Sequence, residues 1–168
     1  MDIEEVESKV KGWCTDEGIF KIKRPRDQNA EFIFDLIYPY NHPHPMNFLV
    51  VMPKDQDQIK IICGTQISPP HLQCLKKPEI NQKFLQGFTK SMLFLQVLHS
   101  IKQEENIPNF WELSEEIYID GLTKNEFFKV LRKIYFATIS AILLLNELCT
   151  PGEISKTAPG LEHIPFYG

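Results

Sequence analysis

The sequence lacks the short motifs that announce many kinds of catalysis. It contains no glycine-rich phosphate loop, no G-x-S-x-G, no H-E-x-x-H and no C-x-x-C, and only 8 of its 168 residues are glycine. Each of these motifs places particular groups around a phosphate, a nucleophile or a metal, so their absence argues against the corresponding chemistry. We therefore expect no cofactor and favour a protein that is not an enzyme.

Long apolar runs and clustered positive charge are also missing. The most apolar charge-free run, IYFATISAILLLN, covers only 13 residues from Ile134 to Asn146, whereas a membrane-spanning helix needs about 20. The net charge of −4 does not suit a protein that contacts many nucleic-acid phosphates. The acidic start, MDIEEVESK, has no apolar segment typical of a signal peptide. The sequence therefore predicts a cytoplasmic protein without membrane or nucleic-acid partners.

Cysteine is sparse as well. The four cysteines, Cys14, Cys63, Cys74 and Cys149, are scattered, and none forms a close pair along the sequence. In a chain of this length, such spacing indicates reduced thiols in a cytosolic protein rather than a disulfide framework.

What the sequence does contain is a clear succession of helical and extended patterns. Ordinary apolar (43%) and charged (24%) contents favour one globular domain, residues 1–149, followed by a tail, residues 150–168. Apolar periodicity and turn residues first predict a helix over Ile3–Trp13 and then four strands, in GIFKIKRP, EFIFDLIYP, MNFLVVMP and QIKIICGTQI. A short helix from Ser68-Pro69 and a long helix over Glu79–Gln103 should follow. After these we expect two short strands near Phe110–Leu113 and Glu116–Asp120, or one bent strand, and a last helix from the capping box Thr123–Glu126 to Leu148.

The order of these elements predicts the fold class. The connections between the first four strands are too short for crossover helices, so neighbouring strands should pair antiparallel. Strands in a run, followed by helices, indicate an α+β fold of two layers. We expect an antiparallel sheet of about five strands packed against the long helices.

The last helix is apolar on two sides. Its first face should pack on the sheet and comprises Phe127, Leu131, Ile134, Thr138, Ala141, Ile142 and Leu145. A second apolar face, roughly opposite, consists of Phe136, Ile139 and Leu143. Either the two long helices cover each other, or a second subunit or a bound partner segment covers this second face. On the latter interpretation, Phe136, Ile139 and Leu143 are partner-binding residues.

Two pairs of residues are weak candidates for a ligand or metal site. His42 and His44, in NHPHPM, could face the same way in an extended segment, but zinc sites need three or four ligands. His71 and Cys74, in PPHLQC, have the spacing of a Cys/His nucleophile pair, but a thiol becomes reactive only where its pKa is lowered. A hairpin loop and a half-buried helical turn are the plainer interpretations, so no metal site is predicted.

Two further segments need an interpretation. In the densest basic stretch, KIKRPR, Lys21 and Lys23 are expected on the wet face of a strand whose Phe20 and Ile22 point inward. The tail is too apolar for a plainly disordered end, so it should dock on this chain or on a neighbouring one.

The opening helix IEEVESKVKGW, the four strand segments, the long helix EINQKFLQGFTKSMLFLQVLHSI, the stretch FWELSEEIYIDG and the closing helix together resemble a known architecture. The chain resembles the type III secretion chaperone-like fold over about residues 1–149 and, more closely, an uncharacterised prokaryotic, largely archaeal, family with that fold. Members of the wider group are small, acidic, cytosolic homodimers that bind extended segments of other proteins. The resemblance therefore implies a protein-binding role.

These observations favour a cytoplasmic, non-enzymatic, chaperone-like homodimer. It would bury Phe136, Ile139 and Leu143, or an open sheet edge, against a protein partner. The alternative is an enzyme or sensor that binds a small molecule or metal in a pocket near His42, His44 and His71.

Overall fold

The computed structural model describes residues 2–25 and 27–149. The predicted tail, residues 150–168, lies outside this range, so the tail and its docking stay predictions. The elements are, in order, α1 (Ile3–Asp16), β1 (Phe20–Lys23), β2 (Ala30–Tyr38), β3 (Met46–Pro53), β4 (Gln58–Gln66), α2 (Pro69–Leu75), α3 (Pro78–Leu95), β5 (Leu98–Glu104), β6 (Ile107–Tyr118), the 3₁₀ turn η1 (Ile119–Gly121) and α4 (Lys124–Cys149).

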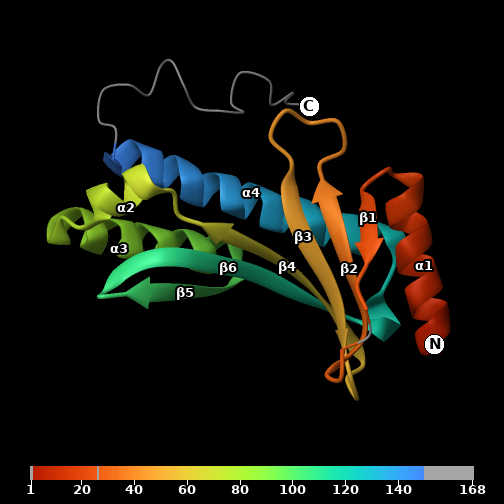
Figure 1. Cartoon of the computed structure of the whole chain (residues 1–168). Helices are drawn as coiled ribbons and strands as arrows, with labels where there is room; N and C mark the ends of the chain where they lie inside the picture. Colours follow the sequence, from red (N-terminus) through yellow and green to blue (C-terminus); the bar gives the residue numbers. More distant parts are fainter. Residues whose placement is uncertain (1, 26, 150–168) are drawn as a thin grey trace.

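The strands form one sheet in the order β1-β2-β3-β4-β6-β5, and every neighbouring pair is antiparallel. The predicted α+β fold is confirmed, with six strands in the described residues instead of about five. Figure 1 shows α4 running along the sheet, with α2 and α3 beside β5 at one end and α1 beside β1 at the other.

The core lies between the sheet and α4. Strands β2, β3 and β4 alternate buried and half-buried residues, as strands with one face on a core do. Their buried residues meet the first apolar face of α4, which contains the predicted residues except for half-buried Ile142. The buried residues of α4 also include Val130, Tyr135 and Ala137, which the prediction did not contain. The side chains with 0% or 1% exposure here include Phe34, Leu36, Phe48, Val50, Ile59, Ile61, Phe127, Leu131, Ile134, Thr138 and Ala141.

The long helix predicted over Glu79–Gln103 is wrong in its last part, which forms strand β5. Helix α3 ends at Leu95, because Gln96 adopts the left-handed conformation (φ 54°, ψ 46°). The Gln96 and Val97 N–H groups donate to the carbonyls of Leu93 and Met92, at 3.1 and 3.0 Å, which is the Schellman arrangement of a helix end. This ending usually contains glycine, so the sequence offered no signal for it.

Strand β6 settles the choice left open for the FWELSEEIY region. It is one strand of 12 residues, and it pairs with β4 on one side and β5 on the other. Half of the predicted capping box is present at the start of α4: the Glu126 N–H donates to Thr123 Oγ1 at 3.1 Å, while the Glu126 carboxylate pairs with Lys129.

The prediction of four reduced cysteines is wrong for two of them. Cys74, near the end of α2, and Cys149, at the end of α4, form a disulfide with a Cα–Cα distance of 5.7 Å. Their separation of 75 residues gave no sign of pairing; the fold brings the ends of the two helices together. Cys14 and Cys63 are free and buried.

Candidate protein-binding surface

One edge of the sheet, β1, has only four residues and is irregular. Its pairing with β2 shifts between Phe20 and Ile22, which marks a β-bulge. The bulge turns Ile22 outward, so its side chain is 52% exposed. The expectation that Ile22 points inward beside Phe20 is therefore wrong, although Lys21 and Lys23 are exposed as predicted.

Charged contacts surround this β1 edge. Arg24, just after β1, donates hydrogen bonds from Nε and Nη2 to the Asp35 carboxylate of β2 at 2.8 to 3.0 Å. Lys23 forms an ion pair with Glu7 of α1, so the helix is joined to the strand beside it. A short, bulged and charged edge is a poor template for pairing with another strand.

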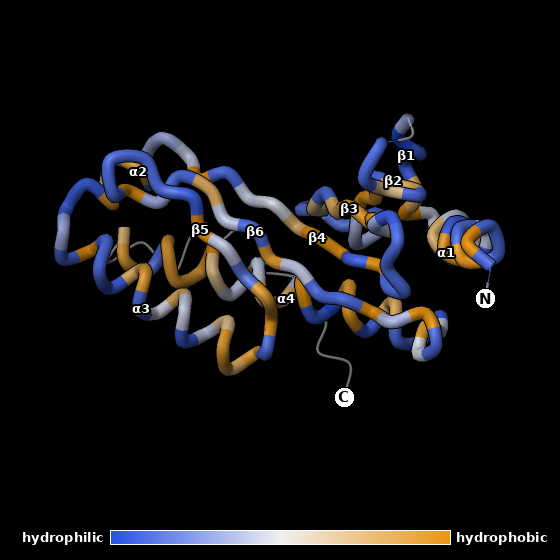
Figure 2. Tube along the Cα trace, turned by 90° about the horizontal axis from the view of Figure 1, so that it is seen from below, coloured by the Kyte–Doolittle hydropathy of each residue, from blue (hydrophilic) through white to orange (hydrophobic). Residues whose placement is uncertain are grey.

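The opposite edge, β5, is different. It has seven residues, and in the described part of the chain no strand pairs with its outer side. Exposed apolar side chains lie where α3 ends and β5 begins: Leu93 (67% exposed) and Phe94 (87%) in the last turn of α3, and Leu98 (53%) at the start of β5. We call these three residues the α3–β5 patch. Figure 2 shows hydrophobic residues at the junction between α3 and β5.

The patch lies on both sides of the β5 edge. The ring of His99 is 5.7 Å from that of Phe88 in α3, so His99 faces the helix layer. Leu98 precedes His99 in the strand and therefore faces the opposite side of the sheet. Leu93 and Phe94 belong to the last turn of α3, so exposed apolar side chains lie near the start of β5 on the helix as well as on the strand.

Helix α3 covers part of α4. A Cβ at Gly87 would lie 2.9 Å from a methyl carbon of Leu144, so the helices touch closely there. Nearer the other end, Lys133 Nζ donates to the Gln96 carbonyl at 2.7 Å. The two helices are thus antiparallel, and each long helix covers part of the other, as one of the two interpretations predicted.

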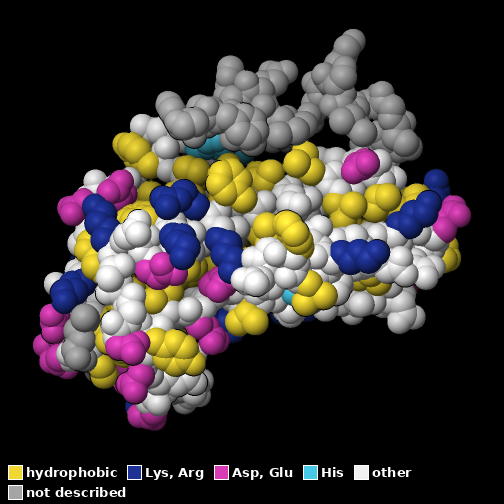
Figure 3. Space-filling model, turned by 180° about the vertical axis from the view of Figure 1, so that it is seen from behind, with side chains coloured by type: hydrophobic (Ala, Val, Ile, Leu, Met, Phe, Trp, Pro, Cys, Tyr) yellow, Lys and Arg dark blue, Asp and Glu magenta, His cyan; other side chains and the backbone are white. Residues whose placement is uncertain are grey.

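The second apolar face of α4 is only partly covered. Ile139 and Leu143 are half-buried, and Phe136 is 49% exposed. Phe136 lies one turn after Lys133 on α4, at the level of the exposed end of α3. Figure 3 shows hydrophobic side chains gathered in a band across this side of the molecule, with Lys and Arg residues grouped beside it.

The histidine candidates do not come together in one site. His42 packs on α4, with its ring 6.0 Å from that of Tyr135 and 6.3 Å from that of His44. His71 contacts Ser68 Oγ at 2.7 Å on α2. The α2 segment is tied to Cys149, 14 residues along α4 from Tyr135, which is about 21 Å of helix.

A metal or nucleophile role for these residues gains no support. Among residues 2–25 and 27–149, no group of three or more His, Cys, Asp or Glu side chains could hold a metal ion. Cys74 is bonded to Cys149 and therefore offers no free thiol to His71.

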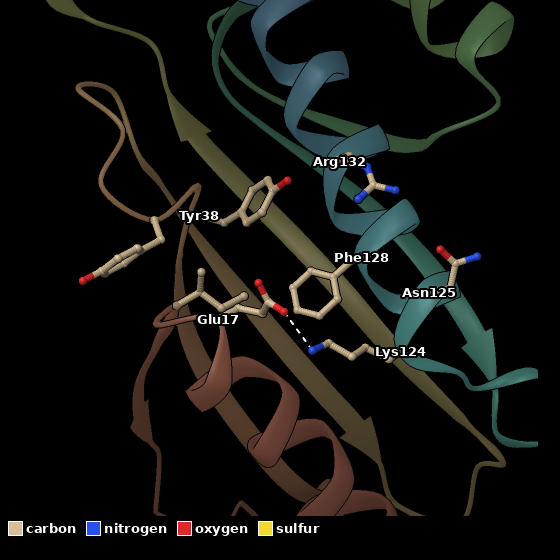
Figure 4. Close-up of a pocket in the computed structure, with 8 residues that line it drawn as sticks. Glu17, Tyr38, Lys124, Asn125, Phe128 and Arg132 are labelled. Atoms are coloured by element: carbon tan, nitrogen blue, oxygen red, sulfur yellow. Dashed lines mark ion pairs between the residues drawn. The ribbon is translucent and has the colours of Figure 1, made fainter. Parts of the chain in front are cut away.

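Sequence reasoning missed a polar pocket at the β1 end of the molecule. Its volume is about 540 Å³, and Figure 4 shows it between the end of α1, the end of β2 and the first half of α4. The side chains that give it its character are Glu17, Tyr38, Tyr40, Lys124, Phe128 and Arg132. They come from three separate segments, so no local pattern in the sequence could have revealed them.

The pKa values of two lining residues, Lys124 and Tyr38, are raised by their surroundings in the pocket. The ion pair with Glu17, at 2.8 Å, raises the pKa of Lys124. Burial raises the pKa of Tyr38, while the positive charge of Arg132 opposes that rise. Figure 4 shows the Tyr38 hydroxyl on the side of the pocket where α4 carries Arg132.

Comparisons with known proteins place the chain in a family. A family model described as "Uncharacterized conserved protein (DUF2299)" matches residues 6–145. The chain belongs to this family. A comparison with curated proteins finds no match, and no helix in the described residues is long and apolar enough to cross a membrane.

Solved structures confirm the predicted resemblance to the type III secretion chaperone-like fold. An uncharacterised protein from Methanothermobacter thermautotrophicus is 24% identical, with a TM-score of 0.75 over 84% of this chain and 96% of that one. The structure of the ExsC–ExsE complex matches with 14% identity and a TM-score of 0.55, over 86% of this chain and 97% of that one. At these identities the DUF2299 chain shares a fold with both proteins.

Proposed function

We propose that this protein is a non-enzymatic, chaperone-like cytoplasmic homodimer that binds protein through the β5 edge, the α3–β5 patch and the second apolar face of α4. The observation that carries the proposal is a free strand edge of seven residues bordered by exposed apolar side chains, of which Phe94 is 87% exposed. Unpaired strand backbone can be extended by another strand, and apolar groups beside it favour association when they leave water.

A second copy of the chain is the occupant that this geometry favours. Two β5 edges that pair antiparallel repeat the same contacts on both sides of a twofold axis, which is the commonest symmetry of homodimers. The patch would then flank the new hydrogen bonds on both faces of the sheet. Phe136, at the level of the α3 end, would extend the buried area onto α4, together with Ile139 and Leu143.

An extended segment of another protein is the second kind of partner that we propose. The neighbour ExsC occurs in a complex with ExsE, and the shared fold suggests by analogy that this chain also binds a protein segment. The free Cys14 and Cys63 thiols favour the proposed cytoplasmic location, whereas the Cys74–Cys149 disulfide is a feature more typical of oxidising compartments. Antibody detection after cell fractionation tests the location.

The homodimer is tested with two matched substitutions. Leu98 on β5 and Ile22 on β1 are apolar edge residues of nearly equal exposure, 53% and 52%. Leu98→Lys places a charge in the proposed interface, and Ile22→Lys places the same charge on the protected edge. Light scattering over a dilution series should give twice the chain mass of 19.6 kDa for the wild type and Ile22→Lys, but a single chain mass for Leu98→Lys.

Two outcomes would contradict the homodimer. A wild-type protein that is monomeric at every concentration would remove the second copy as occupant. An Ile22→Lys variant that dissociates as readily as Leu98→Lys would place the interface elsewhere. Phe136→Asp extends the test to α4, because it should weaken the dimer without lowering the melting temperature of the dissociated chain.

A further inference from the structure

We propose that the pocket between α1, β2 and α4 binds a small aromatic monocarboxylate. This site is distinct from the proposed dimer surface, since it lies at the β1 end of the molecule, while the α3–β5 patch lies at the other (Figure 1). Its volume of about 540 Å³ is within the range of small-molecule sites.

The charges in the pocket select a monoanion. The lining contains two cations, Lys124 and Arg132, and one carboxylate, Glu17, which leaves a net charge of +1. Lys124 and Glu17 neutralise each other across 2.8 Å, from the end of α1 to the start of α4. Within residues 2–25 and 27–149, Arg132 has neither an ion-pair nor a hydrogen-bond partner. One unpaired positive charge suits a carboxylate better than a doubly charged phosphate.

The geometry of the donors also suits a carboxylate. A guanidinium offers parallel N–H groups that match the two oxygens of a carboxylate. Figure 4 shows the Tyr38 hydroxyl pointing toward the part of α4 that carries Arg132. The Tyr38 hydroxyl, like any tyrosine hydroxyl at neutral pH, is protonated and would donate a further hydrogen bond to the same anion.

Aromatic side chains supply a place for a flat apolar body. Phe128 projects from α4 into the pocket, and Lys124 Nζ lies 5.8 Å from the centre of its ring. Tyr40 is 60% exposed, and its ring packs on Gly18 at the rim of the pocket, where a Cβ would be only 3.0 Å from two ring carbons. Ile19, 3% exposed, adds a buried apolar lining residue. A ligand ring that packs on Phe128 would be partly removed from water while its carboxylate reaches Arg132.

Ligand-detected NMR on the full-length protein should measure the binding of phenylacetate and of its neutral analogue phenylacetamide. Phenylacetate should bind with a dissociation constant of about 1 mM, as expected for so small a ligand. Phenylacetamide should bind at least about tenfold more weakly, because it lacks the charge that Arg132 recognises. N-Acetylphenylalanine and its amide, run in parallel, distinguish a free acid from the carboxylate at the end of a peptide.

Substitutions locate the binding on Arg132. Arg132→Gln should weaken phenylacetate binding at least about tenfold, and Arg132→Lys should restore only part of it, since lysine keeps the charge but not the planar fork. Lys129→Gln is the matched control, because it removes one positive charge from the same helix outside the pocket lining. Circular dichroism confirms that each variant is folded.

Three results would overturn the proposal. Equal binding of acid and amide would remove the carboxylate as the recognised group. Equal loss in Arg132→Gln and Lys129→Gln would reduce the effect to general charge. Absence of binding by both phenylacetate and N-acetylphenylalanine to folded wild-type protein would mean that the pocket does not take this class of ligand.

Discussion

The two edges of the sheet differ in length and in exposed apolar surface, although both have an irregular register, between Phe20 and Ile22 in β1 and between Lys102 and Gln103 in β5, and both contain exposed lysines. Strand β1 has four residues, a bulge, and ion pairs that join it to α1 and β2. Strand β5 has seven residues and exposed apolar side chains at its start. Natural sheets usually protect an edge that stays in water. The contrast therefore suggests that β5 is left open for association, and that β1 shows how this fold closes an edge when no partner is expected.

The exposed side of β5 does not imply a weakly held strand. Its inward residue His99 meets Phe88, and Ile101 pairs with the buried Trp111 of β6. The ring of Phe88 is 5.7 Å from that of Trp111. The open edge is thus backed by fully buried aromatic residues, whereas the β1 edge rests on charged contacts and on half-buried Phe20, whose ring is 5.4 Å from that of the buried Phe34.

The largest effect should come from breaking that aromatic core. Phe88 is 0% exposed, so Phe88→Ala should lower the free energy of unfolding by about 3–5 kcal/mol through lost burial and a cavity. Phe20→Ala, under the β1 edge, should cost only about 1 kcal/mol, because the side chain is partly exposed. Urea denaturation in a Leu98→Lys background separates unfolding from dissociation. Equal losses would mean that both edges are anchored alike.

Reduction of the disulfide, which lies at the end of the molecule that carries α2, should have the next largest effect. The Cys74–Cys149 link closes a loop of 75 residues, and a link of this length stabilises a folded chain by about 2–4 kcal/mol. Dithiothreitol should therefore lower the melting temperature of the wild type. The doubly substituted Cys74→Ser, Cys149→Ser variant should already melt at the lower temperature and show no further response.

Thiol counting provides the control for this prediction. Burial raises the pKa of Cys14 to about 12 and also raises the pKa of Cys63. Both thiols therefore stay protonated and unreactive at neutral pH in the folded protein. An unfolded, unreduced chain should contain two reactive thiols, and a reduced chain four. Four thiols without reduction would show that the disulfide does not form.

The smallest effect should come from the β1 edge. Asp35→Asn removes the carboxylate that accepts from Arg24, but the Arg24 side chain is 48% exposed. The loss in free energy of unfolding should be within about 1 kcal/mol, as for other exposed ion pairs. It should shrink further in about 1 M salt, which screens such a pair. A double-mutant cycle with Arg24→Gln measures the coupling; a coupling that salt leaves unchanged would contradict this account.

Much of the fold could be predicted because its signals are local. Strand β3, Met46–Pro53, has the predicted bounds, and β2 and β4 differ from the expectation by one residue at one or both ends. In each of these strands, apolar residues recur at every second position, as a strand with one buried face requires. The buried face of α4 followed for the same reason from its helical spacing. The start of α4 could also be predicted, because the Thr123 side chain caps the helix by accepting a hydrogen bond from the nearby Glu126 N–H.

The errors have a common physical origin in contacts between distant segments. Leu98 and Ile101 continue the apolar spacing of α3, but hydrogen bonds to β6 hold them in a strand. Ile22 has the alternation of an inward residue, but the bulge against β2 reverses it. The pocket could not be predicted at all, since Glu17, Tyr38 and Arg132 meet only after α1, β2 and α4 have packed.

The sequence by itself determined the α+β class, the one-sided burial of the central strands and the excess apolar surface on the last helix, because these depend on the spacing of residues along one segment. Only the tertiary structure decided where α3 stops, which cysteines pair, which sheet edge is protected and which charged groups share a pocket. Each of these depends on distances between segments far apart in the chain, and local periodicity carries no information about such distances.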